Sequence, residues 1–255
     1  MRLLAIKNLF CRNAGGSHVC LPLGKQIEFK LKLFLIKQII FGLSRSMRAG
    51  MPALRQMQIL VATKNAGKIK EIEELLSDLP IQLRSLKEFE NIPEAEETGK
   101  TFAENAAIKA KFYARQTGLW SLADDSGLAV EALGGAPGFF SARYAGENSS
   151  YAEKIGKLLK ELEAANDENR RAAFVCVAAI ADEKGEIKFS AEGVCRGEIS
   201  REPRGANGFG YDPIFVPEGF DKTLGELSVN IKQEISHRAR AVRKIIRFLG
   251  DFTAI

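Results

Sequence analysis

The stretch that decides the fold class is "QILVATKNAGKIKEIEELL", residues 58–76. Its first six residues are mostly apolar, which is typical of a short buried strand. From residue 66 onward the apolar side chains recur at helical spacing, so we expect a helix directly after the turn. A strand that leads through a short turn into a helix is a unit of α/β proteins.

The turn itself resembles a phosphate-binding loop. A Walker A loop reads G-x-x-x-x-G-K-[ST], and Gly67 and Lys68 match its second glycine and its lysine. Ala62 and Ile69, however, stand where the first glycine and the hydroxyl residue belong. The motif alone therefore favours equally a plain strand–helix joint with a solvated lysine and a phosphate cradle of another design. In a cradle, Thr63 and Asn65 would donate hydrogen bonds beside the positive helix end.

The rest of the chain repeats strands and helices. Thr101 and Glu104 form a T-x-x-E capping box, which predicts a helix that begins at Thr101 and stops at Gly118. Ser236 is expected to cap a final helix, in which Ala239, Val242, Ile246 and Leu249 are buried. Further helical spacing covers 151–165, and strands are expected at 81–86, 120–125, 172–182 and 187–199, the last two forming a hairpin. This alternation predicts an α/β fold with a mixed β-sheet flanked by helices.

The first 56 residues differ from the remainder. They hold ten of the 37 basic side chains and one of the 32 acidic ones, so residues 57–255 carry 27 basic and 31 acidic groups. We interpret 1–56 as a basic extension from an upstream start, the true start being Met47, Met51 or Met57. A targeting peptide and a membrane-surface helix around 28–43 are the alternatives. The acidic remainder gives no reason to expect a nucleic-acid partner.

Cysteine and histidine usage excludes several chemistries. None of the four cysteines forms a C-x-x-C pair, and the only histidines are His18 and His237. A cysteine zinc site or a disulfide framework is therefore not expected, and a reducing cytoplasm is the default compartment. No apolar run approaches the length of a membrane span, so no membrane partner is expected.

Two acidic segments are candidates for metal binding. In "ADDSG" (123–127), Asp124 and Asp125 follow an apolar run, and on an extended segment they point to opposite faces. One carboxylate would then face a ligand while the other meets a structural partner; the alternative is an Asp/Ser/Gly turn. A carboxylate of "EAEET" (94–98) would complete an oxygen site for Mg²⁺, although a solvated acidic loop is the simpler interpretation.

Two later segments are candidates for recognising a nucleotide base. In "GANGFGYDP" (205–213) the glycines let the backbone approach a ligand, and Phe209 and Tyr211 suit stacking on a base. "SHR" (236–238) offers the donors of His237 and Arg238 at a helix start, the alternative being an exposed helix histidine. No Ser–His–Asp set or Cys–His pair is legible, so metal-assisted attack by water is the simplest chemistry.

The ordered set of motifs resembles the inosine triphosphate pyrophosphatase family, also described as dITP/XTP pyrophosphatases. The resemblance rests on "TKNAGKIKE", "EETGKTFAENAAIKA", "ADDSGLAVEALGGAPGFFSARYAG", "GFGYDPIF" and "ISHRARA", and it covers 57–250. It implies a single domain over 57–255 with an elongated mixed sheet and two lobes that enclose a substrate cleft. It also implies a cytoplasmic, Mg²⁺-dependent homodimer that hydrolyses ITP, dITP and XTP to the monophosphate and pyrophosphate.

The resemblance also implies roles for individual residues. Asp125 matches the catalytic acid/base that also touches the metal, and Glu97 the second metal carboxylate, with Glu96 as the alternate. The implied substrate-binding residues are Thr63, Lys64, Asn65, Ala66, Gly67, Lys68, Ser126, Phe209, Gly210, Tyr211, Asp212, Lys232, His237 and Arg238. Lys64 stands where the family has a small or polar residue, and we expect its side chain to point away from the phosphates.

Two rival functions follow from the same sequence. One is a phosphohydrolase for modified pyrimidine nucleotides, which rates on dUTP and dTTP would separate from a purine enzyme. The other is a non-enzymatic nucleic-acid-binding protein, suggested by the basic residues before position 57. Salt-dependent DNA binding that requires residues 1–56 would support it.

Overall fold

The computed structural model describes residues 57–165 and 167–252. The predictions made for residues 1–56, namely an upstream extension, a targeting peptide or a surface helix, lie outside the described residues. Among the described residues, no helix has both the length and the apolar character needed to cross a bilayer.

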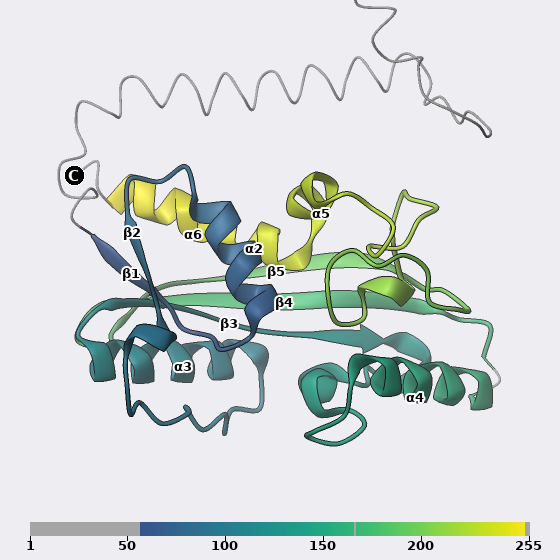
Figure 1. The fold of residues 1–255 in the computed structure, drawn as a ribbon. Coiled ribbons are helices and arrows are strands. Elements are labelled where there is room, and N and C mark those ends of the chain that lie inside the picture. Colours follow the sequence, from purple (N-terminus) through teal and green to yellow (C-terminus); the bar gives the residue numbers. More distant parts are fainter. Residues whose placement is uncertain (1–56, 166, 253–255) are drawn as a thin grey trace, which may run out of the picture. The chain divides into compact units, whose positions relative to one another are not determined.

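A six-stranded mixed sheet forms the centre of the fold, in the order β2-β1-β3-β4-β5-β6 (Figure 1). β1 pairs in parallel with β2 and β3, whereas the remaining neighbours are antiparallel. The predicted α/β class with a mixed sheet is confirmed, as is the hairpin of β4 and β5. The strands are β1 (Gln58–Val61), β2 (Gln82–Ser85), β3 (Trp120–Val130), β4 (Arg171–Ala181), β5 (Ile187–Ile199) and β6 (Phe215–Pro217).

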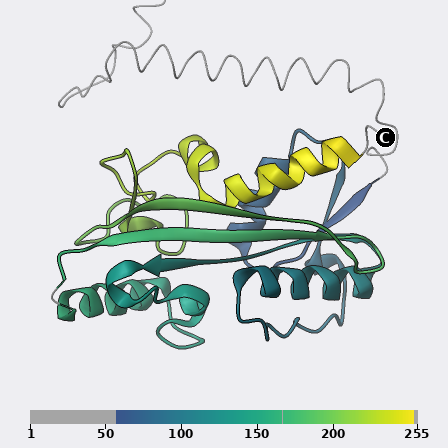
Figure 2. The ribbon, with the colours of Figure 1, turned by 180° about the vertical axis from the view of Figure 1, so that it is seen from behind.

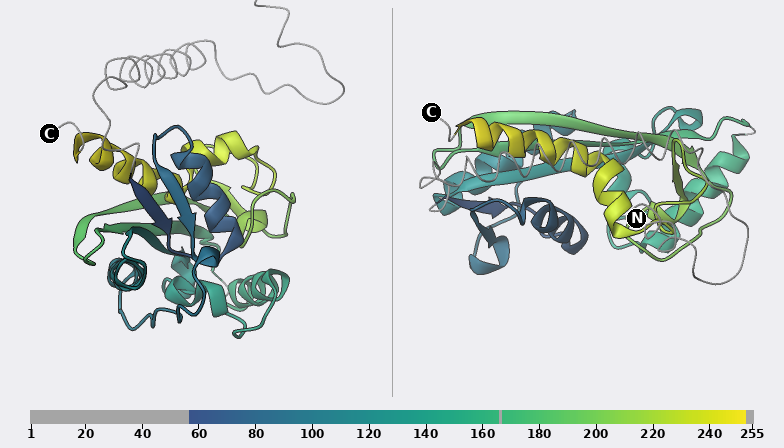
Figure 3. Two further views of the ribbon diagram at one scale, coloured as in Figure 1. Left: turned by 60° about the vertical axis from the view of Figure 1, so that its left-hand side comes forward. Right: turned by 90° about the horizontal axis from the view of Figure 1, so that it is seen from above.

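Helices cover both faces of this sheet, as the view from behind and the two further views make clear (Figures 2 and 3). One face carries α2 (Ala66–Leu76), α5 (Val229–Ile235) and α6 (His237–Phe252). The other carries α3 (Phe102–Thr117) under one end of the β4–β5 hairpin and α4 (Tyr151–Ala164) under the other. Short 3-10 helices join the elements within the described residues: η2 (Leu86–Glu88), η3 (Glu131–Leu133), η4 (Gly138–Arg143) and η5 (Asp212–Ile214).

Three apolar clusters hold these layers together. Ile72 and Leu76 of α2 pack with Val242 and Leu249 of α6 on one face. Alanines of α3 pack on the opposite face, and a third cluster lies between α4 and the far half of the sheet. Cys176 is fully buried in the sheet, as expected for a small core residue.

The helix ends agree closely with the capping residues of the sequence. The Thr101 hydroxyl accepts a hydrogen bond from the Glu104 N–H at 3.0 Å, and Gly118 ends α3 in a left-handed conformation with φ 67°. The Glu104 carboxylate, however, accepts from the Lys100 N–H rather than from Thr101, so only half of the predicted capping box forms. The Ser236 hydroxyl accepts from the Ala239 N–H at 3.2 Å, which confirms the predicted start of α6.

Three details of the sequence-based prediction were wrong. β3 does not end at Asp125 but continues to Val130, because β4 pairs with it along that whole length. The seven-residue helix α5 was missed, since it is too short to show a helical period of its own. In α6, Ile245 is fully buried and Ile246 only partly, which moves the buried stripe by one residue.

Candidate functional site

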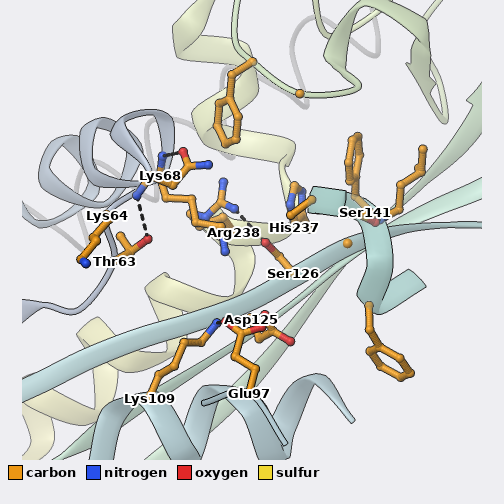
Figure 4. A pocket seen from close by; sticks show the side chains of 18 of the residues that line it. Thr63, Lys64, Lys68, Glu97, Lys109, Asp125, Ser126, Ser141, His237 and Arg238 are labelled. Atoms are coloured by element: carbon orange, nitrogen blue, oxygen red, sulfur yellow. Dashed lines mark hydrogen bonds and ion pairs between the residues drawn. The ribbon is translucent and has the colours of Figure 1, made fainter. Parts of the chain in front are cut away.

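A pocket of about 270 Å³ opens over residues 125–128 of β3. Figure 4 shows Thr63, Lys64 and Lys68 on one side of it, and His237 and Ser141 on the other. Most of the site residues expected from the sequence line this pocket: Thr63, Lys64, Asn65, Lys68, Glu97, Asp125, Ser126, Phe209, Gly210, Tyr211, Asp212, Lys232, His237 and Arg238. Its lining does not include Ala66, Gly67 or Glu96.

The turn between β1 and α2 presents the start of a helix to the pocket. Asn65 is the N-cap of α2, and its side-chain oxygen accepts from the Lys68 N–H at 3.1 Å. The Thr63 hydroxyl accepts from the Asn65 N–H at 3.2 Å. Among the first turn's side chains none is acidic, so the positive end of the helix dipole is not neutralised within its own turn. Lys64 instead pairs with exposed Glu94 at 2.9 Å.

The two neighbouring aspartates of β3 face opposite sides of the sheet, as the pleat requires. Asp125 faces α3, where it meets Lys109 and Asn105. Asp124 faces α2 and α6, where it meets Lys68 and Arg238, each at 3.2 Å. Both are buried within the strand, so the alternative of a solvated Asp/Ser/Gly turn is excluded.

Lys109 of α3 joins two carboxylates on the pocket wall. Its ammonium lies 2.9 Å from Asp125 Oδ1 and 2.9 Å from Glu97 Oε1 (Figure 4). Burial alone would lower the pKa of Lys109, but the carboxylates of Asp125, Asp124 and Glu97 raise it above its ordinary value. Burial raises the pKa of Asp125, and Lys109 opposes part of that increase. The result is a charged lysine beside a carboxyl group that protonates more readily than usual.

Asn105 of α3 holds the acidic loop, which contains Glu97, next to Asp125. The Asn105 side chain donates to Asp125 Oδ2 at 3.3 Å and accepts from the Gly99 N–H at 2.8 Å. Of the two alternative metal carboxylates, Glu97 lines the pocket and shares Lys109 with Asp125, whereas Glu96 lies outside the lining. Sequence reasoning left this choice open because the register of an irregular loop is not periodic.

The donor chemistry at Asp125 and Glu97 fits a magnesium ion only with help from a ligand. Across residues 57–165 and 167–252, no three His, Cys, Asp or Glu side chains converge as an ion site of their own. Mg²⁺, however, usually takes one or two carboxylates and fills its remaining positions with water and substrate phosphates. The two carboxylates already bind one cation together, the ammonium of Lys109, so a cation is stable between them.

A second charge cluster lies behind the pocket on the α2 and α6 side. Arg238 binds the carboxylates of Asp124 and Glu71 and donates to the Ser126 hydroxyl at 3.0 Å. Burial would raise the pKa of Asp124, but Lys68 and Arg238 together hold it below its usual range. Arg238 is 2% exposed, so its guanidinium is committed to these three partners. Arg238 thus anchors this cluster and also lines the pocket, and its predicted contact with substrate stays a prediction.

The glycine-rich loop is tied to the same cluster. Lys232 binds both Asp212 and Glu71, the latter at 2.6 Å, and Asp212 accepts from the Phe209 N–H at 2.7 Å. The Lys232 ammonium also lies 4.8 Å from the centroid of the Phe209 ring. A Cβ added at Gly67 would lie 2.5 Å from that ring, so only glycine fits there. Gly67 therefore supports Phe209 rather than lining the pocket itself.

His237 is buried, which contradicts the alternative of an exposed helix histidine. Its ring stacks on Phe174 with centroids 4.7 Å apart and planes at 9°. Burial, reinforced by the nearby charges of Arg238 and Lys232, lowers the pKa of His237 well below its ordinary value. Its Nδ1 has no hydrogen-bond partner among the described residues. The site therefore contains a neutral imidazole with an unused polar atom.

Three residues of these clusters were missed by the sequence analysis: Lys109, Glu71 and Asn105. Lys109 and Asn105 are four apart in α3, on the face that packs against the sheet. A lysine among alanines on a buried face was the one available indication of Lys109, because a buried lysine is almost always paired with an acidic side chain. Glu71 gave no such indication, because it is one of three glutamates in α2, with Glu73 and Glu74, and the sequence alone does not show which of them is turned inward.

Comparison with known proteins places the chain in a defined context. The sequence profile of the Ham1 family matches residues 59–248. The dITP/XTP pyrophosphatase of Coxiella burnetii is 50% identical over 196 residues, which are 76% of this chain and 98% of that protein. The dITP/XTP pyrophosphatase of Bacillus licheniformis is 47% identical over 194 residues, with the same coverage.

The fold also matches a solved structure. The HAM1 protein of Coxiella burnetii superposes with a TM-score of 0.71 at 48% sequence identity. The match covers 76% of this chain and 99% of that one.

Proposed function

The chain belongs to the Ham1 family, and on that premise we propose that it hydrolyses non-standard purine nucleoside triphosphates. The substrates are ITP, dITP and XTP, and the products are the nucleoside monophosphate and pyrophosphate. Relatives at 50% and 47% identity bear the name dITP/XTP pyrophosphatase and are covered almost completely by this chain. Such an enzyme clears the nucleotide pool of bases that miscode.

One observation carries the proposal: Lys109 bridges Asp125 and Glu97 in the same pocket as the start of α2. Hydrolysis of a triphosphate needs a place for the phosphate charge and a carboxylate beside the attacked phosphorus. The pocket has the cations Lys64 and Lys68 and the N-cap residue Asn65 of α2 on one wall, and the carboxylates Asp125 and Glu97 on another. A pocket with this combination is suited to a highly charged substrate with phosphoric anhydride bonds rather than to an uncharged ester.

We assign the phosphate end of the pocket to the turn from Thr63 to Lys68. The helix start and the Lys68 ammonium would neutralise the triphosphate, and the Thr63 hydroxyl and Asn65 amide would orient it. Lys68 already has a carboxylate partner in Asp124, so its position is fixed before substrate arrives. A preorganised cation stabilises a developing charge without reorganising in the transition state.

We assign proton transfer to Asp125. A carboxylate with a raised pKa is a better general base for water than an ordinary one, because its pKa lies nearer the working pH. Lys109 and Asn105 fix the orientation of its two oxygens. Asp125 and Glu97 are also the residues that would hold Mg²⁺, which supplies charge neutralisation for the phosphates when bound.

Base recognition is assigned to the wall made by α6 and the glycine-rich loop. Phe209 offers a ring for stacking, and neutral His237 offers an unused polar atom. A 6-oxo purine accepts a hydrogen bond where adenine presents an amino group. An adenine would leave a buried donor unpaired, at a cost of about 1–3 kcal/mol. Arg238 acts here through Ser126 and Asp124, whose positions it fixes.

The proposal extends to the molecule's organisation. Residues 57–255 form the catalytic domain, with two lobes that enclose the substrate cleft, and 1–56 are an extension without a catalytic role. The enzyme acts as a Mg²⁺-dependent cytoplasmic homodimer, and neither nucleic acid nor membrane is its partner. The family match to residues 59–248 supports the assignment of the domain.

The test is pyrophosphate release from a panel of triphosphates, with Mg²⁺ and with a chelator. We expect turnover of ITP, dITP and XTP at rates at least tenfold above ATP, with pyrophosphate rather than phosphate as product; that ratio is about 1.4 kcal/mol of discrimination. Preference for dUTP or dTTP would instead support an enzyme for modified pyrimidines. Asp125→Asn serves as the matched inactive protein, which identifies any contaminating hydrolase.

A further inference from the structure

Tyr151, the first residue of α4, lies in the pocket lining but has no part in the function proposed above. Its ring is held at two sides. It meets the Tyr211 ring edge-on, with centroids 5.8 Å apart and planes at 84°. The Lys154 ammonium lies 4.8 Å from its centroid, and that lysine is only 4% exposed. The ring therefore has a defined orientation in the protein without substrate.

The phenol end of this ring is directed toward the glycine-rich loop. A Cβ added at Gly210 would lie 3.5 Å from Tyr151 Cε1 and 3.9 Å from its hydroxyl oxygen. Gly210 follows Phe209 directly, so the hydroxyl lies next to the loop to which we assign base stacking. The Tyr151 hydroxyl thus borders the base end of the pocket, on the α4 side.

The Tyr151 hydroxyl is also free to bind a ligand. Among the described residues no hydrogen bond is formed by its oxygen, whereas the Tyr211 hydroxyl donates to Ser141 O at 3.0 Å. Burial raises the pKa of Tyr151, so its hydroxyl keeps its proton at neutral pH and remains a donor. A half-buried donor that faces a pocket without a protein partner is suited to an acceptor on the ligand.

We infer that Tyr151 is a specificity-determining residue, whose hydroxyl donates a hydrogen bond to the 2-oxo group of a xanthine base. The inference rests on the proposed function. The phosphates occupy the end at Thr63–Lys68, so the base lies at the opposite end, with its 6-oxo group toward His237. The 2-position is on the same edge of the purine, two ring atoms away. It carries an oxygen in XTP and only a hydrogen in ITP.

This contact separates two substrates that the remaining site treats alike. ITP and XTP share their triphosphate and their 6-oxo group, so the cradle, Asp125 and His237 do not distinguish them. A neutral hydrogen bond in a partly buried site changes affinity by about three- to tenfold. Tyr151 would therefore set the ratio of XTP to ITP hydrolysis without taking part in the chemical step.

The test compares Tyr151→Phe with Tyr144→Phe in the full chain. Tyr151→Phe removes the hydroxyl and keeps the ring between Tyr211 and Lys154. Tyr144 lies outside the pocket lining, and its hydroxyl donates to Glu161. Tyr144→Phe is therefore the matched control, because it also removes a tyrosine hydroxyl from the same region of the chain. We measure kcat and KM for XTP and ITP, and the calorimetric Kd of XMP and IMP.

For Tyr151→Phe we expect the XTP-to-ITP ratio of kcat/KM to fall about three- to tenfold, with the loss in KM and a matching loss in XMP affinity. Tyr144→Phe should keep the wild-type ratio. An unchanged ratio in Tyr151→Phe, or an equal loss on both substrates, would overturn the inference and leave the proposed function standing. Wild-type protein that hydrolyses neither substrate would overturn both.

Discussion

At the scale of single residues, the site depends on how Lys109 partitions its charge between two carboxylates. Asp125 is buried enough to resist ionisation, and Lys109 restores part of its acidity. Asp124, one residue earlier, has two cations and stays ionised under all ordinary conditions. Adjacent aspartates on one strand therefore differ in chemistry because the pleat delivers them to different helices.

Replacing Lys109 should alter the pH dependence of catalysis. Because Lys109 lowers the pKa of Asp125, Lys109→Met raises that pKa, and Asp125 then needs a higher pH to be ionised. The acid limb of kcat/KM should shift to higher pH, as measured on ITP at saturating Mg²⁺.

Asp125→Asn should lower kcat by about 10²- to 10⁴-fold at every pH, the usual contribution of a general base.

The control for the Lys109→Met experiment is Lys188→Met, which removes a lysine at the start of β5 that pairs with Asp182 and Glu186 and lies outside the pocket lining. Its pH profile should match the wild type. An acid limb that stays in place in Lys109→Met, with Asp125→Asn inactive, would show that the lysine does not tune Asp125.

At the scale of elements, the start of α6 is positioned by its close approach to β5. A Cβ added at Gly193 would lie 2.1 Å from His237 O and 2.5 Å from Ala241 N, both backbone atoms. The helix can therefore lie on the strand only where no side chain intervenes. His237 and Arg238 are the first two residues of that helix, so packing at Gly193 sets their place in the pocket.

Gly193→Ala should disturb stability and activity together. The added methyl group must displace α6, and overpacking of this kind costs about 1–3 kcal/mol in the free energy of unfolding. We expect a lower urea midpoint and a raised KM for ITP, since His237 moves with the helix. Gly156→Ala in α4 is the control, because a Cβ there meets nothing within 4 Å. Gly156→Ala should stabilise the protein by about 0.5–1 kcal/mol, because alanine loses less backbone entropy in a helix than glycine, and should keep KM. Equal behaviour of the two variants would show that the close approach at Gly193 does not position α6.

At the scale of the whole molecule, the basic residues 1–56 differ from the remainder of the chain in charge and lie outside the family match. The family profile covers 59–248, and the acidic residues lie almost entirely after position 56. Among the described residues, the three apolar clusters and the pocket lie within 57–252. From the family match we therefore expect the folding and the chemistry proposed here to be independent of residues 1–56.

Deleting residues 1–56 should leave the enzyme intact. We expect residues 57–255 to show the same kcat/KM for ITP and the same urea midpoint as the full chain. Light scattering on both proteins measures the oligomeric state, with a dimer expected for each. A loss of activity or of the dimer in the shorter protein would assign the extension a structural role, and salt-sensitive DNA binding by the full chain alone would give it another.

Much of the fold was predictable because its determinants are local. The period of the apolar residues indicated α2 and α4, and the caps at Thr101 and Ser236 located the starts of α3 and α6 within one residue. The predicted strand for β3 was too short because Asp, Ser and Gly residues favour turns. In the structure, pairing with β4 keeps these residues extended. The α5 helix was missed because seven residues contain too few turns to show a period.

The sequence by itself determined the kinds of elements, their order and the opposite directions of Asp124 and Asp125. These follow from short-range periodicity and from the pleat, which need no knowledge of neighbours. Only the tertiary structure decided that Lys109 lies between Asp125 and Glu97, that Glu71 anchors Arg238, and that His237 is neutral. Those outcomes depend on which charges share a buried space, and burial and Coulomb energies follow distance in space rather than separation along the chain.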